Sequence, residues 1–383
     1  INLFEAEKID LKEKSETCPM ASGKLIRHNV IILAALMLFQ CKTGYPPQIG
    51  KLLDERIQKH FAETEVIDLL YFTNRQTMAS TGVCSNDNVT VKHSRNLVSG
   101  TCRVQVPRNH EIGSLAQADR PGADRQNLFS ILSGERLNDG LSAVRSREII
   151  VFVHGFNVKF EEAVLRAAQI QYDLKFPGQI VLFSWPAGPS DDVLIESLSL
   201  TRTYRENQAN AAATVNDFAR WIVDISSKAD TVHLIVHSMG HQVAIPGLKK
   251  ALEEKPGLKF GEIVFFAPDF PADQYDKYRQ SIQSAAYRTT LYCSPGDNAL
   301  VVSNRVNGNY RLGMCKRIPG ADVINVNEVD DPVFGVGGLG HGYYSSRPIL
   351  TDLFQLFLGM PVEKRLFIRK SDPGHGEDYV LRK

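Results

Sequence analysis

The residues with the clearest chemical potential are Val236-His237-Ser238-Met239-Gly240, which end the apolar run 231–236. A β-branched run that stops at x-Ser-x-Gly, with helix-compatible sequence beyond it, is typical of a strand–turn–helix nucleophile elbow. Such a turn presents a serine hydroxyl at the top of a parallel sheet, where a base can reach it. The pattern therefore predicts nucleophilic acyl-transfer chemistry at Ser238.

A serine hydroxyl needs a base, and the base needs an acid to orient it. In sites of this architecture the order along the chain is serine, acid, histidine. Asp297 follows a strand-like run, and His341 lies in a glycine-rich loop before the last helix-like segment. Asp269, after the preceding strand, is the alternative acid, and His375 is a weaker alternative base. For each aspartate the competing interpretation is a turn cap, and for His341 it is a surface loop residue.

An acyl-transfer site also needs two N–H groups that face the developing oxyanion. The amide of Met239, directly after the nucleophile, is the first candidate. The amide of Phe156 is the second, because Gly155 before it allows a close approach of the backbone at the end of a strand-like run. We expect His154 to hold this loop in place.

Three histidines, His233, His237 and His241, recur every four residues, a spacing that suggests a metal-binding face on a single helix. They straddle the expected strand, turn and helix, so we predict no metal site, and the chemistry requires no cofactor. The formal net charge is +1, from 44 Lys+Arg and 43 Asp+Glu, and no basic patch stands out. We therefore expect no nucleic-acid partner.

The first 41 residues have the character of a leader. Residues 1–19 precede a methionine and are expected to be an upstream extension, whereas residues 20–41 combine basic residues with a short apolar run. A run of about ten residues predicts a secretory signal, since a membrane span needs about twenty. Cys41 stands where a lipoprotein carries its lipidated cysteine, although Leu38-Phe39-Gln40 is bulky for that site. We expect an exported, periplasmic or envelope-associated protein with membrane anchoring through Cys41, and a cytosolic chain with a buried N-terminal helix is the alternative.

Six cysteines are present, of which Cys18 and Cys41 belong to the leader. An even number remains, which in an exported protein suggests two disulfides. Pairing of sequence neighbours, Cys84–Cys102 and Cys293–Cys315, is the simplest of the three connectivities that four cysteines allow.

Strand-like and helix-like runs alternate over most of the chain, which predicts an α/β fold with a mainly parallel sheet flanked by helices. The expected strands are 66–73, 101–106, 148–154, 179–185, 231–236, 262–267, 289–293 and 322–327. The expected helices are 160–174, 204–226, 243–254, 275–286 and 349–358, and we expect residues 114–145 to form a loop with one helix.

The same alternation suggests the domain boundaries. Residues 42–64 are expected to be a linker, 65–360 one domain, and 361–383 a charged peripheral tail. The stretch between the strands at 262–267 and 289–293 has room for about one helix, so we expect a small or absent cap. Residues 185–203 are expected either to form a rim of the acyl pocket or to pack on the core.

Several short motifs follow one another along the chain in a characteristic order. They are Phe72-Thr73-Asn74-Arg75, Val106-Pro107, His110-Glu111-Ile112-Gly113, Val153-His154-Gly155-Phe156-Asn157, Phe183-Ser184-Trp185-Pro186, His237-Ser238-Met239-Gly240, Ala267-Pro268-Asp269, Ser294-Pro295-Gly296-Asp297-Asn298-Ala299-Leu300 and Gly340-His341. Together they resemble a bacterial α/β-hydrolase family of unknown function, usually described as esterase- or lipase-like, whose members often carry an export or lipoprotein signal. The resemblance covers roughly residues 66–360. It implies the α/β-hydrolase fold, with Ser238 as nucleophile, Asp297 as acid and His341 as base.

Two positions depart from the expected pattern. Val236 stands where the tight elbow normally has Gly or Ala, and Pro246 falls inside the helix after the serine. We predict a serine hydrolase that acts on small carboxylic esters through an acyl-enzyme. The alternatives are a catalytically idle hydrolase scaffold that serves as an envelope binding module, and a thioesterase, an amidase or a cofactor-free haloperoxidase.

Overall fold

The structure, a computed structural model, describes residues 65–78, 83–108, 110–115, 128–189, 196–329, 341–372 and 375–382. The expected leader, the linker and Cys41 lie outside these ranges, and their assignments stay predictions. None of the described helices combines the length and the apolar character that crossing a membrane requires.

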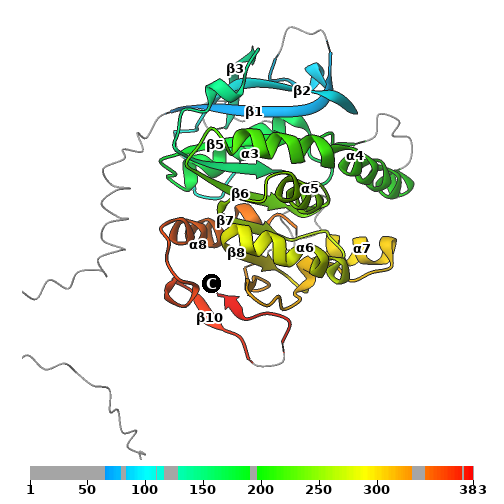
Figure 1. Ribbon diagram of the computed structural model, residues 1–383, viewed down its shortest axis with the longest axis vertical. Coiled ribbons are helices and arrows are strands. Elements are labelled where there is room, and N and C mark those ends of the chain that lie inside the picture. The colour runs from blue at the N-terminus through cyan, green and yellow to red at the C-terminus, as the bar shows by residue number, and fades with distance from the viewer. Residues whose placement is uncertain are drawn as a thin grey trace, which may run out of the picture. The chain divides into compact units, whose positions relative to one another are not determined.

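The described strands are β1 (Val66–Thr77), β2 (Val89–Gln105), β3 (Ser130–Leu137), β4 (Glu148–Val153), β5 (Gln179–Ser184), β6 (Thr231–His237), β7 (Phe260–Phe266), β8 (Ala286–Cys293), β9 (Asp322–Asn325), β10 (Ile368–Lys370) and β11 (Tyr379–Leu381). They form one sheet in the order β10-β11-β9-β8-β7-β6-β4-β5-β1-β2-β3, which Figure 1 shows from β3 at one end to β10 at the other. The eight strands from β1 to β11 in this order are parallel. Strands β2, β3 and β10 are antiparallel to their neighbours at the two edges.

The described α-helices are α3 (Phe160–Asp173), α4 (Glu196–Ile225), α5 (His241–Glu254), α6 (Ala272–Ala285), α7 (Asn298–Asn307) and α8 (Arg347–Phe357). Apolar side chains of α3 and α8 share one buried cluster with the sheet, and those of α4, α5 and α6 share another. The central strands are therefore buried on both faces, as their nearly continuous apolar sequences require.

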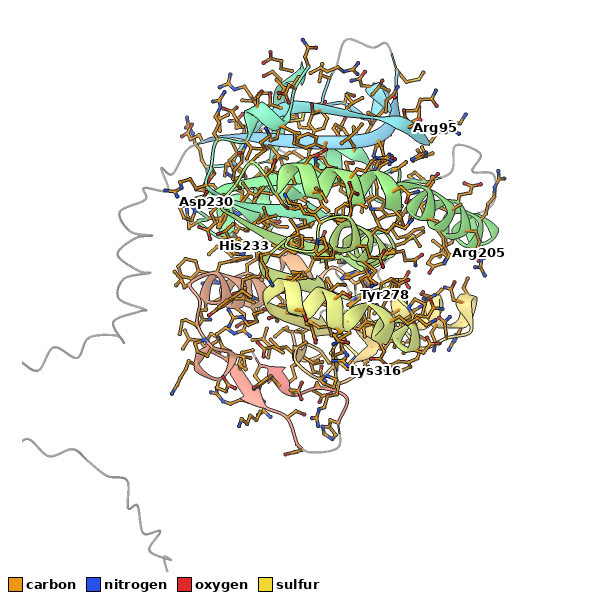
Figure 2. The ribbon with its side chains drawn as sticks, viewed as in Figure 1. Arg95, Arg205, Asp230, His233, Tyr278 and Lys316 are labelled. Carbon is orange, nitrogen blue, oxygen red and sulfur yellow. A yellow bond between two sulfur atoms is a disulfide. The ribbon has the colours of Figure 1, made fainter. Side chains whose placement is uncertain are left out.

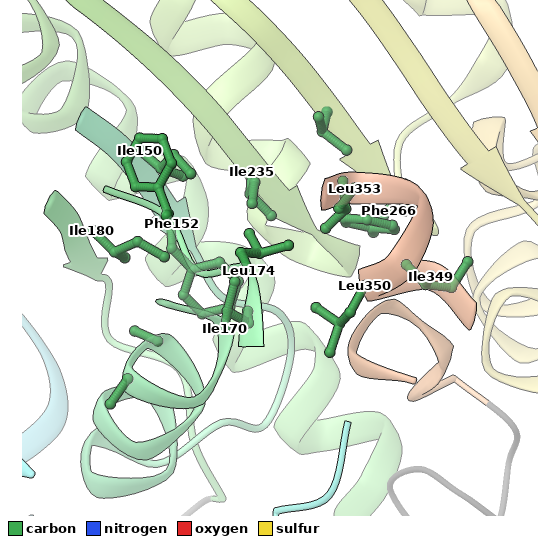
Figure 3. Close-up of a cluster of buried hydrophobic side chains, with 14 of the residues drawn as sticks. Ile150, Phe152, Ile170, Leu174, Ile180, Ile235, Phe266, Ile349, Leu350 and Leu353 are labelled. Atoms are coloured by element: carbon green, nitrogen blue, oxygen red, sulfur yellow. The ribbon is translucent and has the colours of Figure 1, made fainter. Parts of the chain in front are cut away.

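One of these clusters is drawn in Figure 3. The sheet contributes Ile150, Phe152 and Ile235, which face Ile170 of α3 and Leu353 of α8. Each fully buried aliphatic or aromatic side chain contributes about 1.5–3 kcal/mol relative to exposure. The two helices thus fix β4 and β6, the strands that lead into the candidate site.

Two expectations about the periphery are wrong. Residues 130–137, expected to lie in a loop with a helix, form β3 against β2, and Gly134 lets this strand pass the disulfide because a Cβ there would lie 2.3 Å from Sγ of Cys84. Residues 361–383, expected to be a peripheral tail, contribute β10 and β11, and Ile368 and Leu381 are buried. Backbone pairing with the existing sheet stabilises both segments, although their own sequences are short or polar.

The connection between β7 and β8 holds α6 and no further helix. This confirms the expectation that no large cap is inserted there. Both predicted disulfides, Cys84–Cys102 and Cys293–Cys315, are present and confirm the pairing of sequence neighbours.

Candidate active site

Ser238 lies at a sharp turn between β6 and α5. Its φ of +52° is in the left-handed region, which a non-glycine residue occupies only when its surroundings hold it there. Val236 stays in the ladder, opposite Val153 of β4 and Phe265 of β7. The β-branched residue therefore does not displace the elbow, and α5 continues through Pro246.

Three predicted residues lie within hydrogen-bond distance of one another. Oγ of Ser238 is 2.6 Å from Nε2 of His341, and Nδ1 of His341 is 2.6 Å from Oδ2 of Asp297. The carboxylate only accepts, so Nδ1 carries the proton and Nε2 is left to accept the Ser238 hydroxyl proton. The arrangement has the geometry that activates a serine by an oriented base.

Asp297 is held by the start of α7. Its side chain caps the helix by accepting the Leu300 N–H at 3.0 Å, while its own N–H donates to the carbonyl of Ser294 at 3.2 Å. Asn327 accepts the N–H of Gly296 at 3.2 Å and so ties the same turn to the end of β9. Helix α7 was not among the expected helices, although an aspartate after a strand is a common helix cap.

Asp269, the alternative acid, makes different contacts. It accepts the hydroxyls of Tyr204 at 2.8 Å and Ser303 at 2.5 Å and pairs with Nε of Arg311 at 3.1 Å. Burial and, after it, the charge of Asp269 raise the pKa of Tyr204 to about 12. His375, the weaker alternative base, contacts Ser371 between β10 and β11. The structure thus brings together Ser238, Asp297 and His341 and leaves both alternatives outside this cluster.

The loop after β4 packs directly against the elbow. A Cβ at Gly155 would lie 2.8 Å from Cβ of Ser238, and a Cβ at Gly240 would lie 2.5 Å from the carbonyl of His154. The loop that carries Phe156 therefore packs against the elbow, and Met239 follows the nucleophile in the turn that begins at Ser238. The role of their N–H groups as oxyanion donors stays a prediction.

A buried arginine anchors this loop, a role that the sequence analysis missed. Arg75 of β1 donates to Oγ of Ser184 at 3.0 Å and to the carbonyls of Ala187 at 2.5 Å and Val158 at 2.9 Å. Burial lowers the pKa of Arg75 to about 9. One arginine therefore joins the ends of β1 and β5 to the segment that carries the candidate oxyanion donor.

His154 and Trp185 complete the support of the loop. Burial and the adjacent Arg75 lower the pKa of His154 to about 3, so the ring is neutral and its Nε2 contacts Oγ of Ser184 at 3.2 Å. Trp185 stacks on His154 at 5.5 Å between ring centroids and donates Nε1–H to the His154 carbonyl. Both side chains are buried supports of the site.

The three histidines that recur every four residues, His233, His237 and His241, make separate contacts. His233, near the start of β6, bonds Glu148 at 2.9 Å, and Figure 2 shows it on the same side as Asp230. Nε2 of His237 lies 3.2 Å from the carbonyl oxygen of His341 and donates its N–H to that oxygen. Nδ1 of His241 lies 2.7 Å from the carbonyl oxygen of Ser238. Burial, with a smaller contribution from His341, holds the pKa of His237 well below its usual value. His237 therefore contacts the backbone of the candidate base, and His241 contacts the backbone of the nucleophile.

Comparisons with known proteins identify the family and the fold of this chain. A family model described as an alpha/beta hydrolase of unknown function (DUF900) matches residues 132–358, a range that includes Ser238, Asp297 and His341. The search of curated proteins finds no significant match. The family match covers more than half of the chain, and the mainly parallel sheet with helices on both faces is the fold that it implies. The chain therefore belongs to this family of α/β hydrolases of unknown function.

Proposed function

We propose that the protein hydrolyses carboxylic esters through an acyl-enzyme on Ser238. The observation that carries the proposal is the pair of 2.6 Å contacts that His341 makes, one with the Ser238 hydroxyl and one with the Asp297 carboxylate. A base within hydrogen-bond reach of a nucleophile, itself oriented by a third group, is the arrangement that this chemistry requires.

In the first step His341 takes the hydroxyl proton on Nε2 while Oγ of Ser238 bonds to the ester carbonyl carbon. The negative charge moves to the carbonyl oxygen, for which the N–H groups of Phe156 and Met239 are the proposed donors. The bond to the alcohol oxygen then breaks, and His341 returns its proton to the leaving alcohol. Asp297 stabilises the imidazolium that exists between these events.

In the second step water replaces the alcohol. His341 takes a proton from the water as its oxygen attacks the acyl carbon, and the oxyanion forms again beside the same donors. The bond between Oγ and the acyl carbon breaks, the proton returns to Ser238 and the free acid leaves. The first step leaves Ser238 acylated, and the second restores it, so the two steps together consume only an ester and water.

Labelling with a fluorophosphonate tests the activated serine directly. We expect the full chain to be labelled, the Ser238→Ala variant to lose the label, and Ser227→Ala, which changes an exposed serine after α4, to keep it. A panel of esters, thioesters and amides on unlabelled protein from the same preparation then separates an esterase from a thioesterase or an amidase. Folded protein that takes no label would contradict the proposal and favour an idle scaffold that binds a partner.

We also propose that the chain is exported. The described structure holds two disulfides, which persist mainly in oxidising compartments. Cell fractionation of the full chain tests this, and radiolabelled palmitate incorporation with Cys41→Ala as control tests lipid anchoring. Recovery in the cytosol with reduced thiols would exclude both.

A further inference from the structure

A cleft of about 330 Å³ opens beside the candidate site, between α4, α5 and the segments that follow β7 and α7. Amide side chains provide most of its polar lining. These lining residues are Gln208, Gln242, Gln274, Asn307 and Asn309, together with Arg311. We call this the amide cleft.

One lining residue of the amide cleft, Gln242, lies about one helical turn along the chain from the nucleophile. Gln242 follows Ser238 by four residues at the start of α5, a rise of about 6 Å along a helix axis. Its Nε2 donates to the carbonyl of Asp269 at 3.0 Å, and the N–H of Asp269 donates to the carbonyl of Ser238 at 3.2 Å. The cleft and the serine therefore share the carboxyl edge of the sheet, where ligands of open α/β sheets gather. Figure 2 shows Arg205, which bridges α4 to the end of α7 here, on the side opposite His233.

Arg311 is the charged group of this lining, and its guanidinium is incompletely used. The side chain is 1 % exposed, and Nε lies 3.1 Å from Oδ1 of Asp269. Nη2 is buried and has no hydrogen-bond partner among the residues that the structure describes. Because Tyr204 and Ser303 already donate to Asp269, that carboxylate is stabilised without the remaining guanidinium N–H groups.

We propose that the amide cleft binds a carboxylate carried by the ester substrate, with Arg311 as its principal ligand. The inference rests on the proposed function and names the substrate class for it, an ester whose acyl or alcohol part ends in a carboxylate. A guanidinium matches the planar carboxylate fork, and the amides of Gln274 and Asn309 line the same cleft. Asp269 beside Arg311 favours a monoanion over a phosphate dianion, because the second charge would face a buried carboxylate without a cation to balance it.

Matched pairs of esters test this on the unmodified protein. The acyl arm compares the mono-p-nitrophenyl ester of glutaric acid with p-nitrophenyl pentanoate. The alcohol arm compares the acetate ester of 4-hydroxybutanoate with butyl acetate. We expect kcat/KM to favour the charged member at least tenfold in one arm, which identifies the part that carries the carboxylate. Ratios of one or less in both arms, in protein that cleaves the neutral esters, would overturn the inference and leave the proposed hydrolase intact.

Variants then assign the effect to Arg311. Arg311→Gln is expected to bring the ratio of charged to neutral kcat/KM close to one, whereas Arg305→Gln, which removes an exposed positive charge on α7, keeps it. Arg311→Gln leaves the buried carboxylate of Asp269 without its ion pair, which can prevent folding. The double variant Asp269→Asn/Arg311→Gln removes that carboxylate and serves as the second test protein. A preserved ratio in either folded variant would contradict the role of Arg311.

Binding of glutarate separates the two proposals. Calorimetry on the full chain is expected to show glutarate binding that weakens at least tenfold in Arg311→Gln or the double variant. Binding without labelling of Ser238 would support the carboxylate site and contradict the hydrolase. Labelling and neutral ester cleavage without glutarate binding would contradict the carboxylate site alone.

Discussion

The carboxylate of Asp297 lies 2.6 Å from Nδ1 of His341 with one oxygen and caps α7 with the other. The cap holds the carboxylate in a fixed orientation beside the base. Asparagine caps a helix as well as aspartate does. Replacing Asp297 by asparagine therefore keeps the helix cap and changes only the contact with His341.

Asp297→Asn is therefore expected to lower kcat by about 10⁴-fold, as an amide no longer favours the required histidine tautomer, with little change in the free energy of unfolding. Ester hydrolysis and urea unfolding measure the two effects. Asp269→Asn is the matched control and is expected to show the reverse pattern, because it leaves Arg311 buried without its ion pair and costs about 3–5 kcal/mol. Asp297→Asn protein that hydrolyses esters at the wild-type rate would exclude Asp297 as the acid.

Gly155 is expected to be required for access to the nucleophile. An alanine there would place Cβ 2.7 Å from Nδ1 of His237 and 2.8 Å from Cβ of Ser238, so the loop or the elbow must move. Because a displacement of about 1 Å at a reacting group costs about 100-fold in rate, Gly155→Ala should slow fluorophosphonate labelling by at least that factor. Gly257→Ala, where a new Cβ meets nothing within 4 Å, should label normally. Equal labelling of the two variants would show that the loop does not approach the serine as described.

Sequence patterns predicted the centre of this molecule better than its edges. The buried strands and long helices have strong hydrophobic periodicity, which made β4, β6 and α3 predictable within a few residues. Strands β10 and β11 have three residues each, and β11 is defined by pairing with β9, and β10 by pairing with β11, so their own sequences carry little signal. Strand β3 is polar and is likewise defined by its pairing with β2, which is why residues 130–137 were expected to be part of a loop with a helix.

In the candidate site, too, local sequence features were predictable and tertiary contacts were not. The elbow and the order of serine, acid and histidine are local or linear features, and they predicted the three residues that lie together. The role of Arg75 depends on contacts more than 80 residues away in the chain, with Ser184 and Val158, which no local pattern reveals. The pairing of Asp269 with Arg311 is likewise a tertiary contact that no local pattern reveals, although the sequence already favoured Asp297 as the acid.

The two disulfides are expected to differ in their effect on activity. Cys293–Cys315 closes a segment that contains Asp297, whereas Cys84–Cys102 joins β2 to the loop before it, and the sequence separations of 22 and 18 residues are similar. Loss of either should therefore cost about 2–4 kcal/mol of unfolding free energy. Only Cys293→Ala/Cys315→Ala should also slow Ser238 labelling in folded protein, because it frees the strand end that leads to the acid. Slower labelling in Cys84→Ala/Cys102→Ala to the same degree would assign the effect to general loosening of the fold.

Two buried histidines are expected to make the fold sensitive to acid. Burial lowers the pKa of His154 and of His241 to about 3, so the folded state does not take up their protons above that pH. The unfolded state takes them up below about pH 6.5, and stability is therefore lost as the pH falls, by about 2 kcal/mol per histidine between pH 7 and pH 5. Urea unfolding at these two pH values should show a smaller pH-dependent loss in His241→Gln than in the wild type. His375→Gln, which changes a side chain that is 59 % exposed, should keep the wild-type loss, and equal losses in all three proteins would show that His241 is protonated in the folded state.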